Sequence, residues 1–380
     1  MPESGPGARA PWARRTLLQR EEARELLIPV LAVVLALLLG AVLVLIGGKS
    51  PVAAYSALLR GAFGGTGNMA ETLINITPLI FTGLSVAFSF RCGLFNIGAE
   101  GQLIMGQVVS AWAGFALAGL PAVVHMPLAL LAGVAAGAIW GAVPGYLKAR
   151  LGVHEVINTI MMNYIALYLS HYLVIGPLKA PGPLPVTPTI APAARLWRFL
   201  PPTRLHLGVI LAVAAVWLVY CLLFRTTIGY EIRAVGQSQE AARYGGISVR
   251  RNIVLAMVIS GGLAGAAGAV QVLGLQYKFL DIFSFTGYGF DGIAVALLGR
   301  NHPLGVLVAA CLFGTLARGA ILMQSIARIP KEIIGIVQAT IVLVVAADEI
   351  IRRFIMPRRK AAAAGQASAT GAEGGADHGA

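Results

Sequence analysis

The sequence predicts an all-α, polytopic membrane protein. Of the 380 residues, 57% are hydrophobic and only 12% are charged, whereas a soluble domain carries roughly 25% charged residues. So few charged side chains could not cover the surface of a soluble fold of this length. The apolar residues also gather in runs of about 20, the length of a helix that spans a bilayer. This composition excludes a typical cytosolic enzyme, a disordered protein and a disulfide-rich secreted module.

Ten apolar segments are predicted to cross the membrane. The first, residues 26–46, holds 21 residues without a charge, which is too long for the core of a signal peptide. The other nine segments, in order, are residues 72–90, 102–120, 127–147, 153–175, 207–224, 253–273, 287–298, 304–323 and 333–347.

The positive charges predict the orientation of these segments. With the N-terminus inside and the ten segments alternating, 19 of the 29 Lys and Arg residues fall in inside loops and 10 fall outside. Cytoplasmic loops carry an excess of Lys and Arg, so both termini are expected in the cytoplasm. Because the charges are scattered between apolar blocks, the net charge of +13 is typical of membrane-surface loops and does not indicate nucleic-acid binding.

The stretches outside the predicted spans differ in character. Residues 1–25 are expected to form a basic cytoplasmic N-terminus, and residues 26–355 the membrane domain. Residues 176–204 include eight prolines and are predicted to be an outer loop with little regular structure. Residues 225–252 form the largest inside loop. Residues 356–380 are rich in Ala and Gly and are predicted to be a disordered cytoplasmic tail.

Small residues recur at helical spacing in two of the spans. In lipid, small side chains let two helix backbones approach closely, so packing within the chain is the ordinary explanation. A sliding surface in a protein that changes shape is the alternative. The fourth span carries Gly133, Gly137, Gly141 and Gly145, and the seventh carries Gly261, Ala264 and Gly265.

A short motif occurs once in each half of the chain. Residues 98–101 read Gly-Ala-Glu-Gly at the start of the third span, and residues 289–292 read Gly-Phe-Asp-Gly at the start of the eighth. These two spans have opposite predicted orientations. The pattern predicts an inverted repeat, in which segments two to five pair with segments seven to ten. Short, Gly-interrupted segments in corresponding positions of two halves indicate a transport path.

The two acids of this motif have two possible roles. A carboxylate deep in a bilayer costs roughly 2.5–3.5 kcal/mol unless it meets water or a protein partner. It could hydrogen-bond a polar solute, or it could cap a helix, where the helix dipole favours it. For other polar residues inside the spans, interhelical hydrogen bonds are the alternative to lining a path. The candidate path residues are Asn75, Asn96, Glu100, Gln102, Asn158, Asn163 and Asp291.

The inside loop is predicted to form one or two helical turns outside the membrane. Ser238 can cap such a helix, and Gly245 or Gly246 can end it. The turn would expose Glu240 and Arg243. The alternatives are a docking element for a partner and an ordinary solvated turn.

No catalytic or metal-binding motif is found in the sequence. Residues 47–50, Gly-Gly-Lys-Ser, imitate the end of a phosphate-binding loop, but Leu43 stands where that motif needs Gly. The chain itself is therefore not expected to bind ATP or another cofactor. The three cysteines have no Cys or His at metal spacing and are predicted to be packing residues.

Several stretches together resemble the permease subunits of bacterial ABC importers for ribose, nucleosides and branched-chain amino acids, and the nucleoside branch is most similar. The resemblance covers residues 25–355. It rests on Phe-Arg-Cys-Gly-Leu-Phe-Asn-Ile-Gly-Ala-Glu-Gly-Gln at 90–102, Glu-Val-Ile-Asn-Thr-Ile-Met-Met-Asn-Tyr-Ile at 155–165, Ile-Arg-Ala-Val-Gly at 232–236, Ile-Ser-Gly-Gly-Leu-Ala-Gly at 259–265 and Gly-Phe-Asp-Gly-Ile-Ala-Val-Ala-Leu-Leu-Gly-Arg-Asn-His-Pro-Leu-Gly at 289–305.

The resemblance implies a multi-pass protein of the bacterial inner membrane that works with three kinds of partner. These are an ABC ATPase subunit that holds ATP and magnesium, a second permease subunit, identical or homologous, and an extracytoplasmic substrate-binding protein. It also implies a coupling helix that docks on the ATPase. The loop lacks the later Ile-x-Leu-Pro of maltose-type importers. The resemblance therefore implies that the chain belongs to the other class of importers. The implied coupling residues are Glu240, Ala241, Ala242, Arg243, Gly245 and Gly246.

Nucleosides are the first expectation for the solute, followed by simple sugars and then branched-chain amino acids. The rival from another class is an ion-coupled secondary transporter that uses Glu100 and Asp291 as proton carriers. The cytoplasmic Glu-Ala-Ala loop discriminates between them, because a secondary transporter has no ATPase to dock.

Overall fold

The computed structural model describes residues 30–281, 284–330 and 332–346. The predicted N-terminal segment 1–25 and tail 356–380 lie outside these residues. The described residues are helical apart from loops and two isolated β-bridges. The helices are α1 (Val30–Ile46), α2 (Pro51–Phe63), α3 (Thr66–Arg91), α4 (Ala99–Ala116), α5 (Ala122–Leu151), α6 (Glu155–Ile175), α7 (Gly208–Arg225), α8 (Thr227–Gln237), α9 (Gln239–Tyr244), α10 (Val249–Gln271), α11 (Tyr288–Leu298), α12 (Pro303–Ala327) and α13 (Glu332–Ala346), with a 3₁₀ turn η1 (Pro192–Ala194) and a π-helical turn η2 (Val272–Gln276) that continues α10.

The chain divides into a large compact unit, residues 37–338, and a small unit formed by the residues before and after it. The described part of the small unit is the helical residues 30–36 and 339–346. Every contact named below lies within the large unit.

The prediction of a polytopic, all-helical membrane protein is confirmed. Among the described residues, five helices are long and apolar enough to cross a membrane, or six if α1 and α2 count as one broken span. The five are α3, α5, α7, α10 together with η2, and α12. The other predicted spans contain helices that are shorter or more polar, such as the 11-residue α11. Helix α2 was not predicted, because residues 51–63 look like part of an outer loop.

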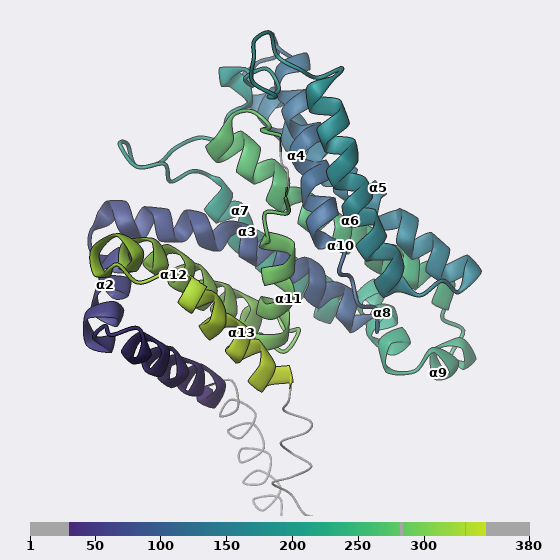
Figure 1. Cartoon of the computed structure of the whole chain (residues 1–380). Coiled ribbons are helices and arrows are strands. Elements are labelled where there is room, and N and C mark those ends of the chain that lie inside the picture. The colour runs from purple at the N-terminus through teal and green to yellow at the C-terminus, as the bar shows by residue number, and fades with distance from the viewer. Residues whose placement is uncertain (1–29, 282–283, 331, 347–380) are drawn as a thin grey trace, which may run out of the picture. The chain divides into compact units, whose positions relative to one another are not determined.

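The packing of the two halves follows the predicted inverted repeat. Helix α3, from the first half, packs against α11 and α12 of the second half. Helix α10, from the second half, packs against α4 and α5 of the first half (Figure 1). The equivalent helices α3 and α10 also touch each other, as do α4 and α11. Exchanging the halves therefore maps these contacts onto one another, which is what a pseudo-two-fold relation requires.

The glycine stripes bring α5 and α10 into backbone contact. A Cβ on Gly137 would overlap the carbonyl oxygen of Gly261, and a Cβ on Gly265 would lie 2.5 Å from that of Gly133. Helix α4 joins this seam, since a Cβ on Gly106 would overlap the carbonyl oxygen of Gly265. The expected role of the stripe in close helix packing within one chain is confirmed.

The proline-rich stretch contains little regular structure, as predicted. Residues 176–207 hold the short turn η1 and two bridges, Val186 to Leu280 and Arg198 to His206. The His206 side chain is buried, and its Nδ1 accepts a hydrogen bond from the Gly208 amide at 3.1 Å. Burial and the Arg198 guanidinium lower the pKa of His206 to about 4. The loop is thus anchored by a neutral imidazole beside the start of α7.

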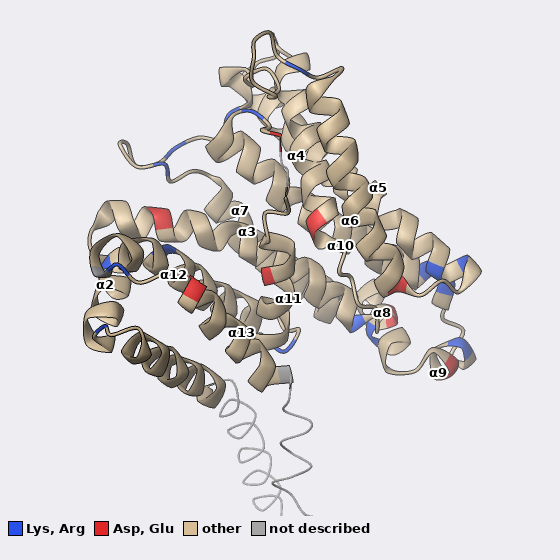
Figure 2. Ribbon diagram, viewed as in Figure 1, with Lys and Arg blue, Asp and Glu red and all other residues tan. Residues whose placement is uncertain are grey.

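The inside loop forms two helices. Thr226 caps α8 through the Gly229 amide, and Ser238 caps α9 through the Ala241 amide at 3.2 Å. Gly245 ends α9, and Gly246 follows at φ +79°, a conformation that favours glycine. This short capped helix is the one that the sequence predicts. A group of Lys and Arg residues lies beside α8 and α9 (Figure 2).

Candidate functional site

The start of α11 lies about halfway along the bundle. Arg91 at the end of α3 donates from Nε to the Asn301 carbonyl at 2.7 Å, so the loop after α11 is level with the end of α3. Helix α11 has 11 residues and is therefore about 16 Å long. A bilayer core is about 30 Å thick. A Cβ on Gly292 of α11 would meet Thr82, so α11 begins beside the middle of the 26-residue α3. If α3 spans the bilayer, the N-terminus of α11 lies near mid-depth.

Helix α4 also begins inside the bundle. The chain turns at Cys92 after α3 and returns to start α4 at Ala99. Asn96, in this turn, donates to the hydroxyl of Ser260 at 2.8 Å, twelve positions into the 23-residue α10. The starts of α4 and α11, one from each half of the repeat, thus both lie inside the bundle. Such discontinuous helices mark the binding region in transporters that are built from inverted repeats.

Glu100 joins these two helix starts. Its side chain is fully buried. One carboxylate oxygen accepts hydrogen bonds from the Thr286 hydroxyl at 2.6 Å and the Gly287 amide at 2.9 Å, and the other accepts from the Gly289 amide at 2.6 Å. The negative charge therefore sits against the positive end of α11. Of its two possible roles, Glu100 performs the capping role here, on the helix of the opposite half.

Gly289 makes this junction possible. A Cβ at this position would lie 2.6 Å from the Cα of Glu100 and 2.8 Å from its Oε2. A Cβ on Gly292, one turn further along α11, would lie 2.6 Å from the hydroxyl oxygen of Thr82 in α3. The two glycines of the second motif thus let α11 lie flush against α4 on one side and α3 on the other.

A hydrogen-bonded network holds the turn before α4. The Asn96 side chain donates to Gln102 at 2.9 Å and accepts from the Gly98 amide at 2.9 Å. Ser260, which it also contacts, donates to the Ser85 carbonyl at 2.7 Å. All of these side chains are buried. The network connects the turn to both α3 and α10.

Asn163 of α6 holds the first turn of α4 from the other side. Its side-chain oxygen accepts from the Gly101 amide at 2.8 Å, and its side-chain nitrogen donates to the Ile97 carbonyl at 3.0 Å. Asn163 therefore satisfies one of the free amides of the α4 N-terminus. The structure brings Asn96, Glu100, Gln102 and Asn163 together as one polar junction.

Asp291 lies beside this junction but is exposed. Within the described part of the chain, its carboxylate accepts no hydrogen bond and forms no ion pair. At the middle of a bilayer a carboxylate facing lipid costs roughly 2.5–3.5 kcal/mol. This face of α11 therefore meets water or another protein rather than lipid.

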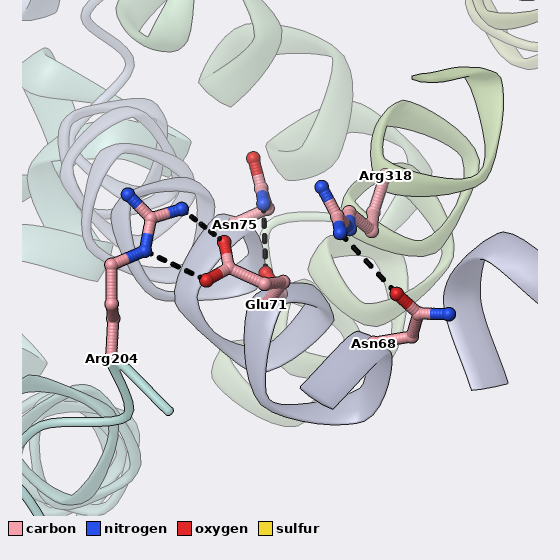
Figure 3. Close-up of polar contacts among 5 residues, drawn as sticks. All are labelled: Asn68, Glu71, Asn75, Arg204 and Arg318. Atoms are coloured by element: carbon pink, nitrogen blue, oxygen red, sulfur yellow. Dashed lines mark hydrogen bonds and ion pairs between the residues drawn. The ribbon is translucent and has the colours of Figure 1, made fainter. Parts of the chain in front are cut away.

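The two remaining candidates lie apart from the junction. Asn75 donates to the Glu71 carbonyl of its own helix at 2.7 Å, in a group that also includes the Glu71–Arg204 ion pair and the Arg318–Asn68 contact (Figure 3). Asn158 is half-buried on α6, and its amide nitrogen has no partner among the described residues. The structure does not connect either residue to Glu100.

Three aromatic residues that the sequence analysis did not single out lie next to the junction. The rings of Tyr164 and Phe285 are 5.3 Å apart, and those of Phe285 and Phe290 are 5.6 Å apart, both edge to face. Tyr164 and Phe290 are exposed, at 45% and 39%. Tyrosine at 164, 168 and 172 is the one sequence signal that could have pointed to this face of α6.

The inside loop is connected to the same region through the end of α3. Arg91 and Arg233 place their guanidinium carbons 5.7 Å and 5.0 Å from the ring centre of Phe224. A Cβ on Gly236 of α8 would overlap the Arg91 carbonyl oxygen. Helix α8 is therefore pressed against the turn that leads to α4. In α9, Glu240 and Arg243 are exposed and Ala242 is buried.

Comparison with known proteins identifies the family. The family model "Branched-chain amino acid transport system / permease component" matches residues 68–346. The guanosine ABC transporter permease protein NupP of Bacillus subtilis is 46% identical over 88% of this chain and 97% of its own length. The nucleoside ABC transporter permease protein NupB of Lactococcus lactis subsp. cremoris is 37% identical over 91% and 97%.

The name of a third relative gives a different solute. The glucose ABC transporter permease protein TsgB13 of Haloferax volcanii is 33% identical over 86% of this chain and 88% of its own length. No solved structure gives a significant match. The family match covers most of the chain, including both helix starts at the polar junction. The chain therefore belongs to the family of permease components of branched-chain amino acid transport systems, and it is a multi-pass membrane protein.

Proposed function

We propose that this chain is the membrane-spanning permease subunit of an ATP-driven ABC importer for nucleosides. Its strongest support is the similarity to two nucleoside permeases over nearly their whole length. The polar junction, where the starts of α4 and α11 meet inside the bundle, suits a passage that opens to one side at a time.

The partners follow from the same proposal. A second permease subunit, identical or homologous, completes the passage on the exposed face of α11. An ABC ATPase subunit, which holds ATP and magnesium, docks on α9 through Glu240, Arg243 and their neighbours. An extracytoplasmic binding protein delivers the solute on the side of the proline-rich loop. Both termini lie in the cytoplasm of a bacterial cell.

Simple sugars are the second candidate, because a glucose permease is 33% identical over most of the chain. Branched-chain amino acids come third, on the family description. An ion-coupled carrier is less well supported by the geometry. Glu100, one of its two proposed proton carriers, is fully buried, and its carboxylate accepts three hydrogen bonds from residues 286–289, so it joins the two halves instead of facing an open path.

Reconstitution tests this proposal. The chain is placed in proteoliposomes with its ATPase, second permease and binding protein, and uptake of labelled guanosine, glucose and leucine is measured with and without ATP. ATP-dependent guanosine uptake is expected. Uptake of glucose or leucine but not guanosine would mean that the solute is a sugar or an amino acid instead of a nucleoside. Uptake without the ATPase would show that the chain is not part of an ATP-driven importer.

A charge reversal at α9 tests the docking element. Glu240→Arg is expected to lower uptake and co-purification of the ATPase while leaving membrane insertion unchanged. Arg150→Glu, an exposed charge reversal at the end of α5, is the matched control. Equal uptake and equal ATPase recovery in both variants would remove α9 as the docking element.

A further inference from the structure

Tyr164, Phe285 and Phe290 form a continuous aromatic surface, which Asp291 extends by one residue. The ring contacts of 5.3 Å and 5.6 Å join three different parts of the chain: α6, the segment before α11 and the first turn of α11. Thr286, next to Phe285, donates to Glu100. The surface is therefore fixed to the polar junction rather than carried on a free loop.

This surface lies near the middle of the bundle. Tyr164 is the tenth of the 21 residues of α6, so about 15 Å of helix extends on either side of it. Phe290 is the third residue of α11, which begins at mid-depth. Tyr164 and Phe290 lie at the same level along the bundle, because the ring of Phe285 contacts both of them.

A surface of this kind does not suit lipid. Tyrosine prefers the membrane interfaces, where its hydroxyl reaches water, but Tyr164 is half-exposed at mid-helix. Residues 284–287 are not helical, and non-helical backbone at membrane depth occurs where it is buried in protein or lines a water-filled cavity. The exposed carboxylate of Asp291 needs the same surroundings. These three observations indicate that this face meets water or another protein rather than lipid.

We propose that Tyr164, Phe285, Phe290 and Asp291 form the surface of the passage that contacts the solute, and that it takes the base of a nucleoside. The inference rests on the proposed function and names the part of the chain that carries it out. The base stacks on the aromatic rings, which suits every base because each has a π face. Asp291 accepts hydrogen bonds from N–H groups of the base or from ribose hydroxyls.

The chemistry of the surface favours a base over the other solutes. A free branched-chain amino acid carries both an ammonium group and a carboxylate, so Asp291 does not select it by charge, and its side chain has no π system to stack on the rings. A simple sugar has no π system to stack on three rings. A purine has the largest flat surface of these solutes and gains most from aromatic neighbours.

The test uses leucine substitutions in the reconstituted importer. Tyr164→Leu, Phe285→Leu and Phe290→Leu keep an apolar side chain and remove the ring. Tyr172→Leu is the matched control, since Tyr172 lies two turns along α6 and is 63% exposed. Phe290→Tyr keeps the ring and serves as the rescue variant. Uptake of guanosine and uridine is measured, together with ATPase activity stimulated by the binding protein.

We expect the three leucine variants to lower guanosine uptake about tenfold or more, in line with the contribution of a stacked aromatic ring. Uridine uptake should fall less, because a pyrimidine offers a smaller π face. Phe290→Tyr and Tyr172→Leu should stay close to the wild type, and the stimulated ATPase activity should persist in all variants, which shows that they are folded and coupled.

Two other outcomes would overturn the inference in different ways. If the wild type imports guanosine and the three variants match Tyr172→Leu, or lose guanosine and uridine uptake equally, the aromatic surface does not contact the base and the proposed function stands. If the wild type imports no nucleoside, the proposed function fails, and the inference that rests on it fails as well.

Discussion

The two halves of the repeat carry the same Gly-x-acid-Gly motif, but the structure uses the two acids differently. Glu100 of the first half is fully buried and accepts three hydrogen bonds from the start of α11. Asp291 of the second half lies on the exposed side of α11, and within the described residues its carboxylate has no hydrogen-bond donor. An inverted repeat can thus preserve the positions of two groups while one becomes structural and the other stays available.

The largest effect on folding stability is expected at Glu100. Glu100→Gln removes the charge and turns an amide nitrogen toward at least one of the three donors. A hydrogen bond to a charged group contributes about 1.5–3 kcal/mol, and a buried donor left without a partner costs a similar amount. We expect a loss of about 3 kcal/mol, seen as a lower melting temperature in detergent. A melting temperature equal to that of the wild type would show that the cap is dispensable.

A smaller loss is expected at the glycine that faces Glu100. In Gly289→Ala the new methyl group meets the backbone of Glu100 at 2.6 Å, and overpacking of this kind costs about 1–3 kcal/mol. Gly67→Ala is the control, because a Cβ there meets nothing within 4 Å. Its helical position should make it neutral or slightly stabilising. Equal melting temperatures for both variants would mean that α4 and α11 separate easily.

A third acid, Glu71, shows what a carboxylate contributes when it is partly buried and its cationic partner is exposed. Glu71 receives two hydrogen bonds from Arg204, at 2.8 Å and 2.7 Å, and the Arg204 side chain is 52% exposed (Figure 3). Ion pairs near the surface contribute about 0.2–1 kcal/mol. A double-mutant cycle with Glu71→Gln and Arg204→Gln should give a coupling energy in this range. A coupling energy as large as the stability loss of Glu100→Gln would show that a partly buried, paired acid contributes as much to stability as a fully buried one.

The smallest effect on stability is expected at Asp291. Substitution of an exposed residue changes stability by about 0.5 kcal/mol or less, so Asp291→Asn should melt like the wild type. Transport should nevertheless fall, because the variant loses the negative charge and replaces one of the two acceptor oxygens with an amide donor. The measurement pairs melting temperature with uptake, and Glu100→Gln provides the same carboxylate-to-amide change in a buried setting. A variant of Asp291 that fails to fold would make this residue structural too.

Much of the fold could be predicted because its physical causes are local. Apolar runs of spanning length, glycines at every fourth position and a Ser cap before 239–244 each act within one helix or one helix face. The structure contains helices at all ten predicted segments and packs the glycine stripes against each other. Helix α2 was missed because its 13 residues are too few to cross a membrane and look like part of an outer loop.

The candidate site was harder to predict because it depends on contacts between distant residues. The motif predicted that Glu100 and Asp291 occupy equivalent places, but not that Glu100 caps the other half, 186 to 189 residues along the chain. Asn75 and Asn163 look alike in sequence, yet one bonds within its own helix and the other holds α4. The Tyr164–Phe285–Phe290 surface forms only when α6 meets the segment before α11, so no single stretch could show it.

The seam between α4, α5 and α10 limits how the protein can move. Where glycine backbones touch, neither helix can turn about its own axis without driving a carbonyl group into its neighbour. These three helices must therefore travel as one piece during any cycle of opening and closing. The short α11 meets this block at α4, through the hydrogen bonds to Glu100 and the close approach of Gly289. If the proposed passage changes width, the change therefore falls at the border of the block, while the glycine-rich helices keep their mutual arrangement.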